Sequence, residues 1–174
     1  MNTENGVPNR TLIIDAEDEF SSPACLMHEV GDAYMGYADK AEIIAFLDEL
    51  LEAERAGARV TLESSRAADA GRLCELLRII QQDEARWCAM LLLHIRALGG
   101  EPSSKVGAFY DKAMAIADLR ERIVFLNRGQ GWVVKKLREM LPRVRGSVLH
   151  ADLADMLRSH EINIDLANGL GARA

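Results

Sequence analysis

The stretch that decides the fold is KAEIIAFLDELLEAERAGARVT, residues 40–61. Its apolar side chains recur at intervals of three and four, which is typical of an amphipathic α-helix. They form one stripe, made of Ile43, Phe46, Leu47, Leu50, Leu51, Gly57, Ala58 and Thr61. Glu54 falls at the centre of that stripe, four residues after Leu50 and four before Ala58. A carboxylate buried there costs several kcal/mol unless it is paired, hydrogen-bonded, protonated or bound to a metal.

The same period continues along the chain and predicts four helices, over residues 40–65, 69–98, 106–141 and 147–168. Asp39 followed by Glu42 is a capping-box pattern at the start of the first helix. Gly99-Gly100 ends the second helix, and Pro102 prevents its continuation. Helices of this length, joined mainly by short links, pack as an antiparallel up-down-up-down four-helix bundle. The sequence therefore predicts an all-α fold, with the bundle over residues 40–174.

Residues 1–39 lack this period and are predicted to form an irregular acidic extension packed on the bundle. They carry eight acidic residues and one basic residue, Arg10, whereas the whole chain has a net charge of −6. The expected docking partners are basic residues of the same chain or of a dimer mate, namely Lys135, Lys136, Arg138, Arg143 and Arg145. Cys25, His28 and Glu29 lie close together in the extension, and packing is the favoured role of this cluster over metal binding.

Composition places the protein among globular domains, with 49% apolar and 28% charged residues. The longest wholly apolar run, Ala89 to Leu93, is too short to span a membrane, and no signal-peptide pattern opens the chain. The acidic net charge argues against a nucleic-acid partner. The three cysteines are odd in number and lack metal-binding spacing, so we expect no disulfide framework and a cytoplasmic location.

Three further polar residues repeat the position of Glu54 on the other predicted helices. Glu84, Gln130 and His160 each fall at the centre of an apolar stripe and near the middle of a helix. Two glutamates, a histidine and a glutamine can supply ligands to iron, manganese or zinc. The alternative is a metal-free hydrogen-bonded layer, with His160 protonated between the carboxylates and Gln130 bridging. The residues alone leave both interpretations open.

Three segments carry a resemblance to a known superfamily. Residues 50–58 (LLEAERAGA), residues 83–88 (DEARWC) and residues 95–103 (IRALGGEPS) resemble the first two helices of ferritin-like, rubrerythrin-related proteins. The likeness implies a ferritin-like fold over about residues 40–168. In that superfamily two helices each supply a glutamate, two others each supply a Glu-x-x-His motif, and the set holds two irons.

The resemblance also implies an incomplete di-iron motif, as in a divergent branch of the superfamily. Glu54 matches the first glutamate, and Glu84 matches the glutamate of the first Glu-x-x-His, but Trp87 stands where its histidine should be. Glu161 matches the second Glu-x-x-His, with Ile164 in place of the histidine. The helical period instead favours His160, the residue before Glu161, as the inward-facing one. The candidate metal ligands are therefore Glu54, Glu84, Gln130, His160 and Glu161.

Two functions from different classes follow from these patterns. The first is a redox or metal-handling protein that binds a transition metal in the bundle core. The second is a metal-free bundle that serves as a binding or scaffolding module, with the polar layer fixing helix register. We expect a homodimer and neither nucleic-acid nor membrane partners. The sequence does not decide whether the protein is an enzyme.

Overall fold

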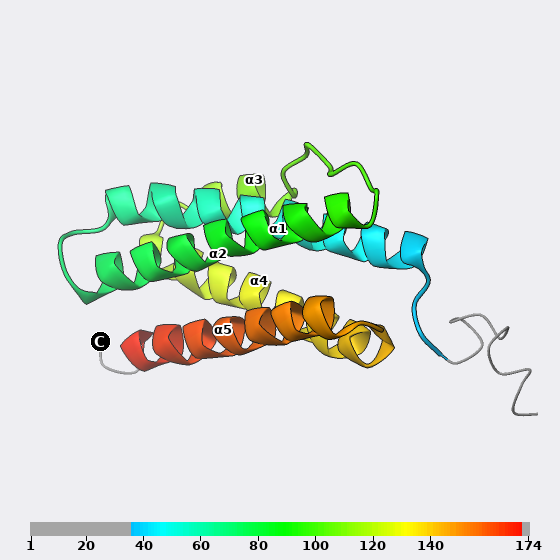
Figure 1. Ribbon diagram of the computed structural model, residues 1–174. Coiled ribbons are helices and arrows are strands. Elements are labelled where there is room, and N and C mark those ends of the chain that lie inside the picture. The colour runs from blue at the N-terminus through cyan, green and yellow to red at the C-terminus, as the bar shows by residue number, and fades with distance from the viewer. Residues whose placement is uncertain (1–35, 172–174) are drawn as a thin grey trace, which may run out of the picture. The chain divides into compact units, whose positions relative to one another are not determined.

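The computed structural model describes residues 36–171, which belong to one compact unit in which every regular element is helical (Figure 1). The elements are α1 (Lys40–Ala67), α2 (Arg72–Ala97), α3 (Phe109–Met114), α4 (Leu119–Met140), the short 3-10 helix η2 (Leu141–Arg143) and α5 (Ser147–Gly171). The prediction of an all-α fold is confirmed for this part of the chain. The predicted extension up to residue 35, with its Cys25, His28 and Glu29, lies outside the described residues.

Local capping fixes the ends of the first two helices as the sequence predicts. Asp39 Oδ1 accepts a hydrogen bond of 2.8 Å from the backbone N–H of Glu42. Gly99 ends α2 with φ of 73°, a left-handed conformation that favours glycine. The carboxylate of Glu42 does not turn back to complete the capping box, because it pairs with Arg143 at a distance of 2.8 Å. This pair connects the start of α1 to η2, which directly follows α4.

The third predicted helix is wrong as a single element, since the structure divides residues 106–141 into α3 and α4. Asp118 caps α4 by accepting a hydrogen bond of 2.9 Å from the backbone N–H of Glu121. The side chain of Arg122 donates twice to the carbonyl of Ile116, at 3.0 and 2.8 Å. These polar contacts hold the backbone out of the helix between residues 115 and 118. The apolar period that runs through the break reflects packing of both helices on the same core.

The link between α2 and α4 runs back along α1 and does not make a short turn. The backbone N–H of Ser103 donates to Asp48 Oδ1 at 2.7 Å, and that of Gly107 donates to the carbonyl of Glu52 at 3.0 Å. The link thus advances in the direction of α1. It starts α4 at the end of the bundle where α2 also starts (Figure 1).

As a result, α2 and α4 run in the same direction, antiparallel to α1 and α5 (Figure 1). Lys136 of α4 pairs with Glu49 of α1. Arg143, further along the chain in η2, pairs with Glu42, which comes earlier in α1, so α4 and α1 run in opposite directions. The predicted up-down-up-down alternation is wrong at the α2–α4 link, because that link crosses the length of the bundle. Helix α1 packs against α2 and α4, and α5 packs against the same two helices. The α1–α5 and α2–α4 pairs are therefore the diagonals.

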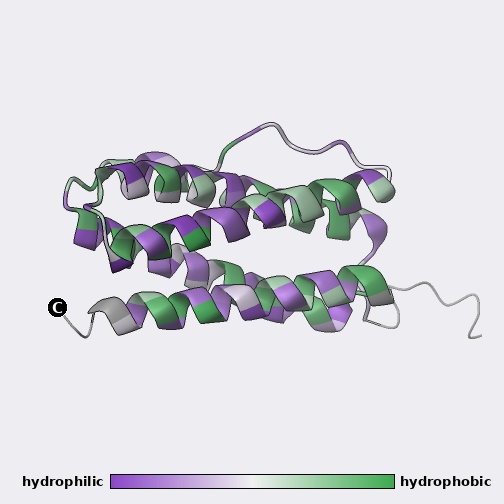
Figure 2. Ribbon diagram, turned by 60° about the vertical axis from the view of Figure 1, so that its left-hand side comes forward, coloured by the Kyte–Doolittle hydropathy of each residue, from purple (hydrophilic) through white to green (hydrophobic). Residues whose placement is uncertain are grey.

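Two apolar clusters form the core, and the polar residues of the predicted layer separate them along the chain. One cluster contains Leu50, Leu91, Leu137 and Leu153. The other contains Val60, Leu77, Ala113 and Leu126. Hydrophobic and hydrophilic residues are interspersed along each long helix (Figure 2). None of the helices described between residues 36 and 171 combines the length and apolarity that a membrane span requires.

The basic residues near the end of α4 largely have partners within the bundle. The ion pairs are Lys135–Glu139, Lys136–Glu49, Arg138–Glu161 and Arg143–Glu42. Arg145 lies over the ring of Tyr37, with its guanidinium 5.9 Å from the ring centroid. Docking of the acidic extension on these residues stays a prediction, since residues 1–35 are not described.

Candidate functional site

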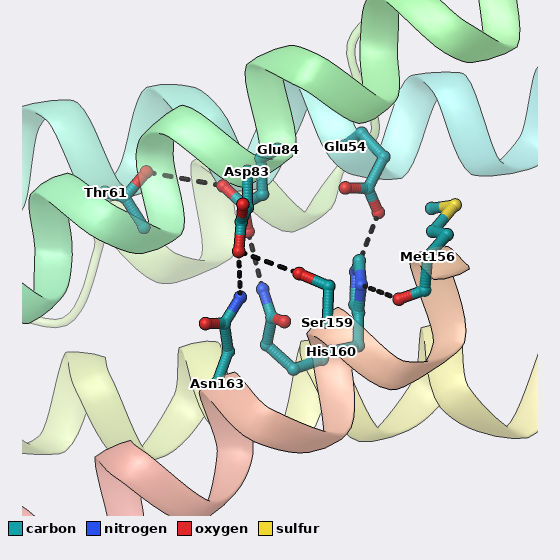
Figure 3. Close-up of polar contacts among 9 residues, drawn as sticks. Glu54, Thr61, Asp83, Glu84, Met156, Ser159, His160 and Asn163 are labelled. Carbon is teal, nitrogen blue, oxygen red and sulfur yellow. Dashed lines mark hydrogen bonds and ion pairs between the residues drawn. The ribbon is translucent and has the colours of Figure 1, made fainter. Parts of the chain in front are cut away.

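The four residues that the helical period places inside, one on each long helix, are all buried in the bundle, and Figure 3 shows three of them, Glu54, Glu84 and His160. Glu54 on α1 and Glu84 on α2 are each 2% exposed, Gln130 on α4 is 4% exposed, and His160 on α5 is 1% exposed. We call these four residues the polar layer. Glu161 is not part of it, because its side chain lies at the surface with Oε1 2.6 Å from an Arg138 guanidinium nitrogen. The structure thus favours the helical period over the motif match on α5.

Two hydrogen-bonded pairs make up the polar layer. His160 Nε2 lies 3.1 Å from Glu54 Oε1 (Figure 3). Gln130 Nε2 donates to Glu84 Oε1 at 2.6 Å. The first pair joins α1 to α5 and the second joins α2 to α4, so each spans a diagonal of the bundle.

The carboxyl group of Glu84 lies directly against the backbone of α1 at Gly57. A Cβ atom at residue 57 would lie 2.4 Å from Glu84 Oε1, so only glycine leaves room for this group. Burial raises the pKa of Glu84 well above 4.5, and the nearby charge of Glu54 raises it further. Hydrogen bonds from Thr61 and Gln130 oppose part of this rise. Burial thus favours the protonated, neutral form of Glu84 over the carboxylate.

Thr61 lies between the backbone of α1 and the carboxyl group of Glu84. Thr61 Oγ1 lies 2.9 Å from the carbonyl of Gly57 and 3.3 Å from Glu84 Oε2 (Figure 3). A hydroxyl group carries a single proton, which the shorter contact to the carbonyl oxygen uses. The longer contact, in which Thr61 Oγ1 is the donor and Glu84 Oε2 the acceptor, is therefore the weaker of the two and opposes only part of the rise in the pKa of Glu84.

His160 is held so that one ring nitrogen faces the polar layer. Nδ1 lies 3.0 Å from the carbonyl oxygen of Met156, which can only accept, so Nδ1 carries a proton (Figure 3). Burial lowers the pKa of His160, but the charge of Glu54, the hydrogen bond to it and the Met156 carbonyl together raise it above 6.5. Contact with Glu54 thus favours the imidazolium form of His160, in which Nε2 donates to Glu54 Oε1.

A second polar cluster beside the layer escaped sequence reasoning. Asp83 Oδ2 accepts hydrogen bonds from Ser159 Oγ at 2.7 Å and from Asn163 Nδ2 at 3.2 Å (Figure 3). Asn163 is 2% exposed and follows His160 by three residues, so both face the interior from α5. The signal that could have revealed it is this i, i+3 spacing of two polar residues on one helical face.

Two acceptor atoms of the polar layer have no hydrogen-bond partner among the described residues. They are Glu54 Oε2 and Gln130 Oε1, both buried. A buried acceptor left without a donor costs about 1–3 kcal/mol. Trp87 Nε1, a buried donor at the position where the superfamily has a histidine, is also without a partner in the described structure.

A cavity of about 440 Å³ between α1, α3 and α4 reaches the polar layer from one side. We call it the α1–α4 cavity. Its lining includes three of the four layer residues, Glu54, Glu84 and Gln130. The rest of its wall is mainly apolar and includes Ala53, Phe109, Phe125, Leu126, Trp132 and Val133. Its volume and composition are those of a small-molecule site: apolar walls with a few polar groups at one point.

Aromatic rings form a large part of the cavity wall. The rings of Phe109 and Phe125 stack with centroids 4.9 Å apart and planes inclined by 8°. Phe109 fits against α4 because residue 129 is glycine, where a Cβ atom would lie 2.8 Å from the ring. Trp132 is 38% exposed, and Lys136 Nζ lies 5.2 Å from its ring centroid. The cavity therefore offers flat apolar surface to whatever enters it.

The donor atoms of the polar layer are paired with one another and are not gathered around one point. Within residues 36–171 no group of three or more His, Cys, Asp or Glu side chains is arranged to hold one. The four layer residues instead form two separate hydrogen-bonded pairs. Trp87 and Gln130 occupy positions at which a second ion would need a histidine and a carboxylate. The described side chains do not fit a two-metal centre.

Comparison with known proteins identifies one family. Residues 41–169 match the model of a family described as a domain of unknown function (DUF6306). No curated protein and no solved structure matches the chain. The family match spans well over half of the sequence and includes all four residues of the polar layer. The chain therefore belongs to the DUF6306 family.

Proposed function

We propose that the fold is ferritin-like. Four-helix bundles with a single long crossover connection are typical of that superfamily, whereas simple up-down-up-down bundles have short links throughout. The link between Ala97 and Leu119 is such a crossover, since it runs along α1 and leaves α2 and α4 parallel. The crossover therefore supports the resemblance better than the predicted short-link topology did.

In this proposal the di-iron ligand positions carry a different set of side chains. Helices α2 and α5 each have one inward-facing i, i+3 pair. On α2 it is Glu84 with Trp87, and on α5 it is His160 with Asn163. Glu54 and Gln130 supply the single positions on α1 and α4. Two of four carboxylates thus remain: burial favours the protonated form of Glu84, and His160 lies 3.1 Å from Glu54. These two effects reduce the negative charge that a metal ion would otherwise have to balance.

We infer that the protein is a metal-free binding module that takes a small molecule in the α1–α4 cavity. The observation that carries this proposal is that Glu54, Glu84 and Gln130 line one end of an otherwise apolar cavity. Groups with perturbed pKa at the end of an apolar cavity are the usual mark of a binding site. The neutral acid of Glu84 can donate a hydrogen bond, and the amide of Gln130 can accept one.

The walls indicate the class of ligand. Stacked Phe109 and Phe125, together with Trp132, favour a planar aromatic molecule. Its polar group would meet Gln130 Oε1 or the carboxyl of Glu84. Outside the polar layer the charged lining residues are Glu49, Glu52, Lys112 and Arg128, whose charges balance, so a neutral ligand would be favoured over an ion.

A panel of planar aromatic compounds, screened by thermal shift and confirmed by isothermal titration calorimetry, tests this function. Ala53→Leu places bulk in the cavity wall and is expected to abolish binding while the protein stays folded. Ala45→Leu, at an exposed α1 position outside this cavity, is the matched control. Binding that survives Ala53→Leu, or no binding by any planar compound, would refute the proposal.

A single transition-metal ion is the second candidate, and the unpartnered Glu54 Oε2 and Gln130 Oε1 favour it. To bind one divalent ion, Glu54, Glu84 and His160 would have to leave the two hydrogen-bonded pairs that they form here and converge as ligands, with Gln130 beside them. Elemental analysis of protein purified without added metal decides between the two. Iron, manganese or zinc near one ion per chain, lost in Glu54→Ala, would establish the metal site. Metal content at background would leave the small-molecule function.

A further inference from the structure

A second hollow, of about 750 Å³, lies between α2, α4 and α5 at the end of the bundle where α2 and α4 begin. We call it the α2–α4–α5 groove. Its floor is aliphatic, with Leu73 and Leu76 from α2 and Ile123 and Val124 from α4. Val124 is 55% exposed, so part of this floor is open to solvent. The volume is within the range of small-molecule sites.

Three arginines, Arg72, Arg120 and Arg128, surround this aliphatic floor. Their guanidinium groups make no hydrogen bond or ion pair with any residue of the described part of the chain, and none of the described lining residues is acidic. The side chains of Asn127 and Asn168 are bonded to each other at 2.9 Å. The groove thus combines uncompensated positive charge with exposed aliphatic surface.

That combination has a specific chemical complement. A guanidinium group binds a carboxylate with two parallel hydrogen bonds, and aliphatic surface removes a hydrocarbon chain from water. A hydrophilic anion would use the arginines but not the floor, and a neutral hydrocarbon would use the floor but not the arginines. Only an anion with an aliphatic chain uses both.

We propose that the α2–α4–α5 groove binds a free fatty acid. Arg72 and Arg120 hold its carboxylate, while Leu73, Leu76 and Ile123 cover its chain. The site is separate from the α1–α4 cavity, with which it shares only Arg128 among the described lining residues. It therefore stands independently of the small-molecule function proposed above.

Calorimetric titration of the full chain with laurate, kept below its micelle concentration, tests the proposal. We expect saturable binding of one laurate per chain. Arg72→Gln with Arg120→Gln removes the carboxylate partners without touching the α1–α4 cavity, and should raise the Kd about tenfold or more. Arg59→Gln with Arg96→Gln makes the same charge change at exposed positions outside the groove, and should leave the Kd within about twofold.

A second variant guards against misfolding of the first. Val124→Glu places a carboxylate at an exposed point of the groove floor and should also weaken laurate binding. Dodecanol, which keeps the chain and lacks the charge, should bind more weakly than laurate. The proposal is overturned if laurate does not saturate, if both arginine pairs weaken binding equally, or if dodecanol binds as tightly. Binding to anionic vesicles without binding of free laurate would overturn it too.

Discussion

His160 Nε2 lies 3.1 Å from Glu54 Oε1 and thereby joins α5 to α1 across a diagonal of the bundle. Gln130 and Glu84 make the matching contact across the other diagonal, at 2.6 Å. The backbones of diagonal helices do not approach one another closely, and these two hydrogen-bonded pairs connect them through side chains. A polar contact that is satisfied in only one register penalises every other register. The polar layer thus fixes how the two helix pairs are rotated and shifted against each other.

Removing the side chain of His160 should destabilise the protein, because His160 is the hydrogen-bond partner of the buried Glu54. In His160→Ala the carboxylate of Glu54 stays buried without its partner, so we expect a loss of about 3–5 kcal/mol in the free energy of unfolding. The double variant Glu54→Leu with His160→Leu removes both charges and should recover most of that loss. Chemical denaturation of the two variants provides the measurement. A single variant as stable as the native protein would show that Glu54 is not charged in the fold.

Glu84→Gln should be well tolerated in the metal-free protein. Because burial favours the neutral form of Glu84, an amide of the same shape is expected to fit in its place, and the free energy of unfolding should change by no more than about 1 kcal/mol. Thermal denaturation at neutral pH measures this change. A loss several times larger, accompanied by loss of bound metal, would instead identify Glu84 as a metal ligand.

Stability should fall as pH rises through the neutral range. The pKa values of Glu84 and His160 are both raised in the folded protein, above 4.5 and 6.5 respectively, so the folded state binds more protons than the unfolded state. Such groups stabilise fully below their unfolded pKa, and this stabilisation is lost as pH rises through the folded pKa. The free energy of unfolding, measured by urea denaturation, should decline steadily between about pH 5 and about pH 9. These limits lie about a unit or more either side of an ordinary histidine pKa. In Glu84→Gln the decline of the free energy of unfolding with pH should be less steep.

The helical period alone located the interior residues, because burial on a helix depends on rotation about its own axis. It placed His160 inside and left Glu161 at the edge, where the structure finds it paired with Arg138. The motif match favoured Glu161 and was less informative. Motif spacing records which ligands a relative uses, whereas the period records which side of this helix is buried.

The break between α3 and α4 and the course of the crossover could not be read from periodicity. The break depends on Arg122 reaching back to the carbonyl of Ile116, a contact that the apolar pattern does not encode. The crossover depends on Ser103 binding Asp48 of α1, which is far away in sequence. The α1–α4 cavity is formed by this crossover packing beside α4. Sequence reasoning therefore found the polar layer and missed the cavity that gives access to it.

Gly57→Ala should destabilise the protein through the polar layer. The added Cβ would lie 2.4 Å from Glu84 Oε1, so the carboxyl group must move away from Gln130 and Thr61, at an expected cost of about 1–3 kcal/mol. Gly131→Ala is the matched control, because residue 131 is also inside a helix and no atom lies within 4 Å of its Cβ position. That substitution should stabilise the protein by about 0.5–1 kcal/mol through helix propensity. Thermal and urea denaturation of both variants measure the difference. If the two substitutions had the same effect, Glu84 would not be packed against Gly57; if Glu84→Ala restored the stability of Gly57→Ala, the clash would be located at that carboxyl group.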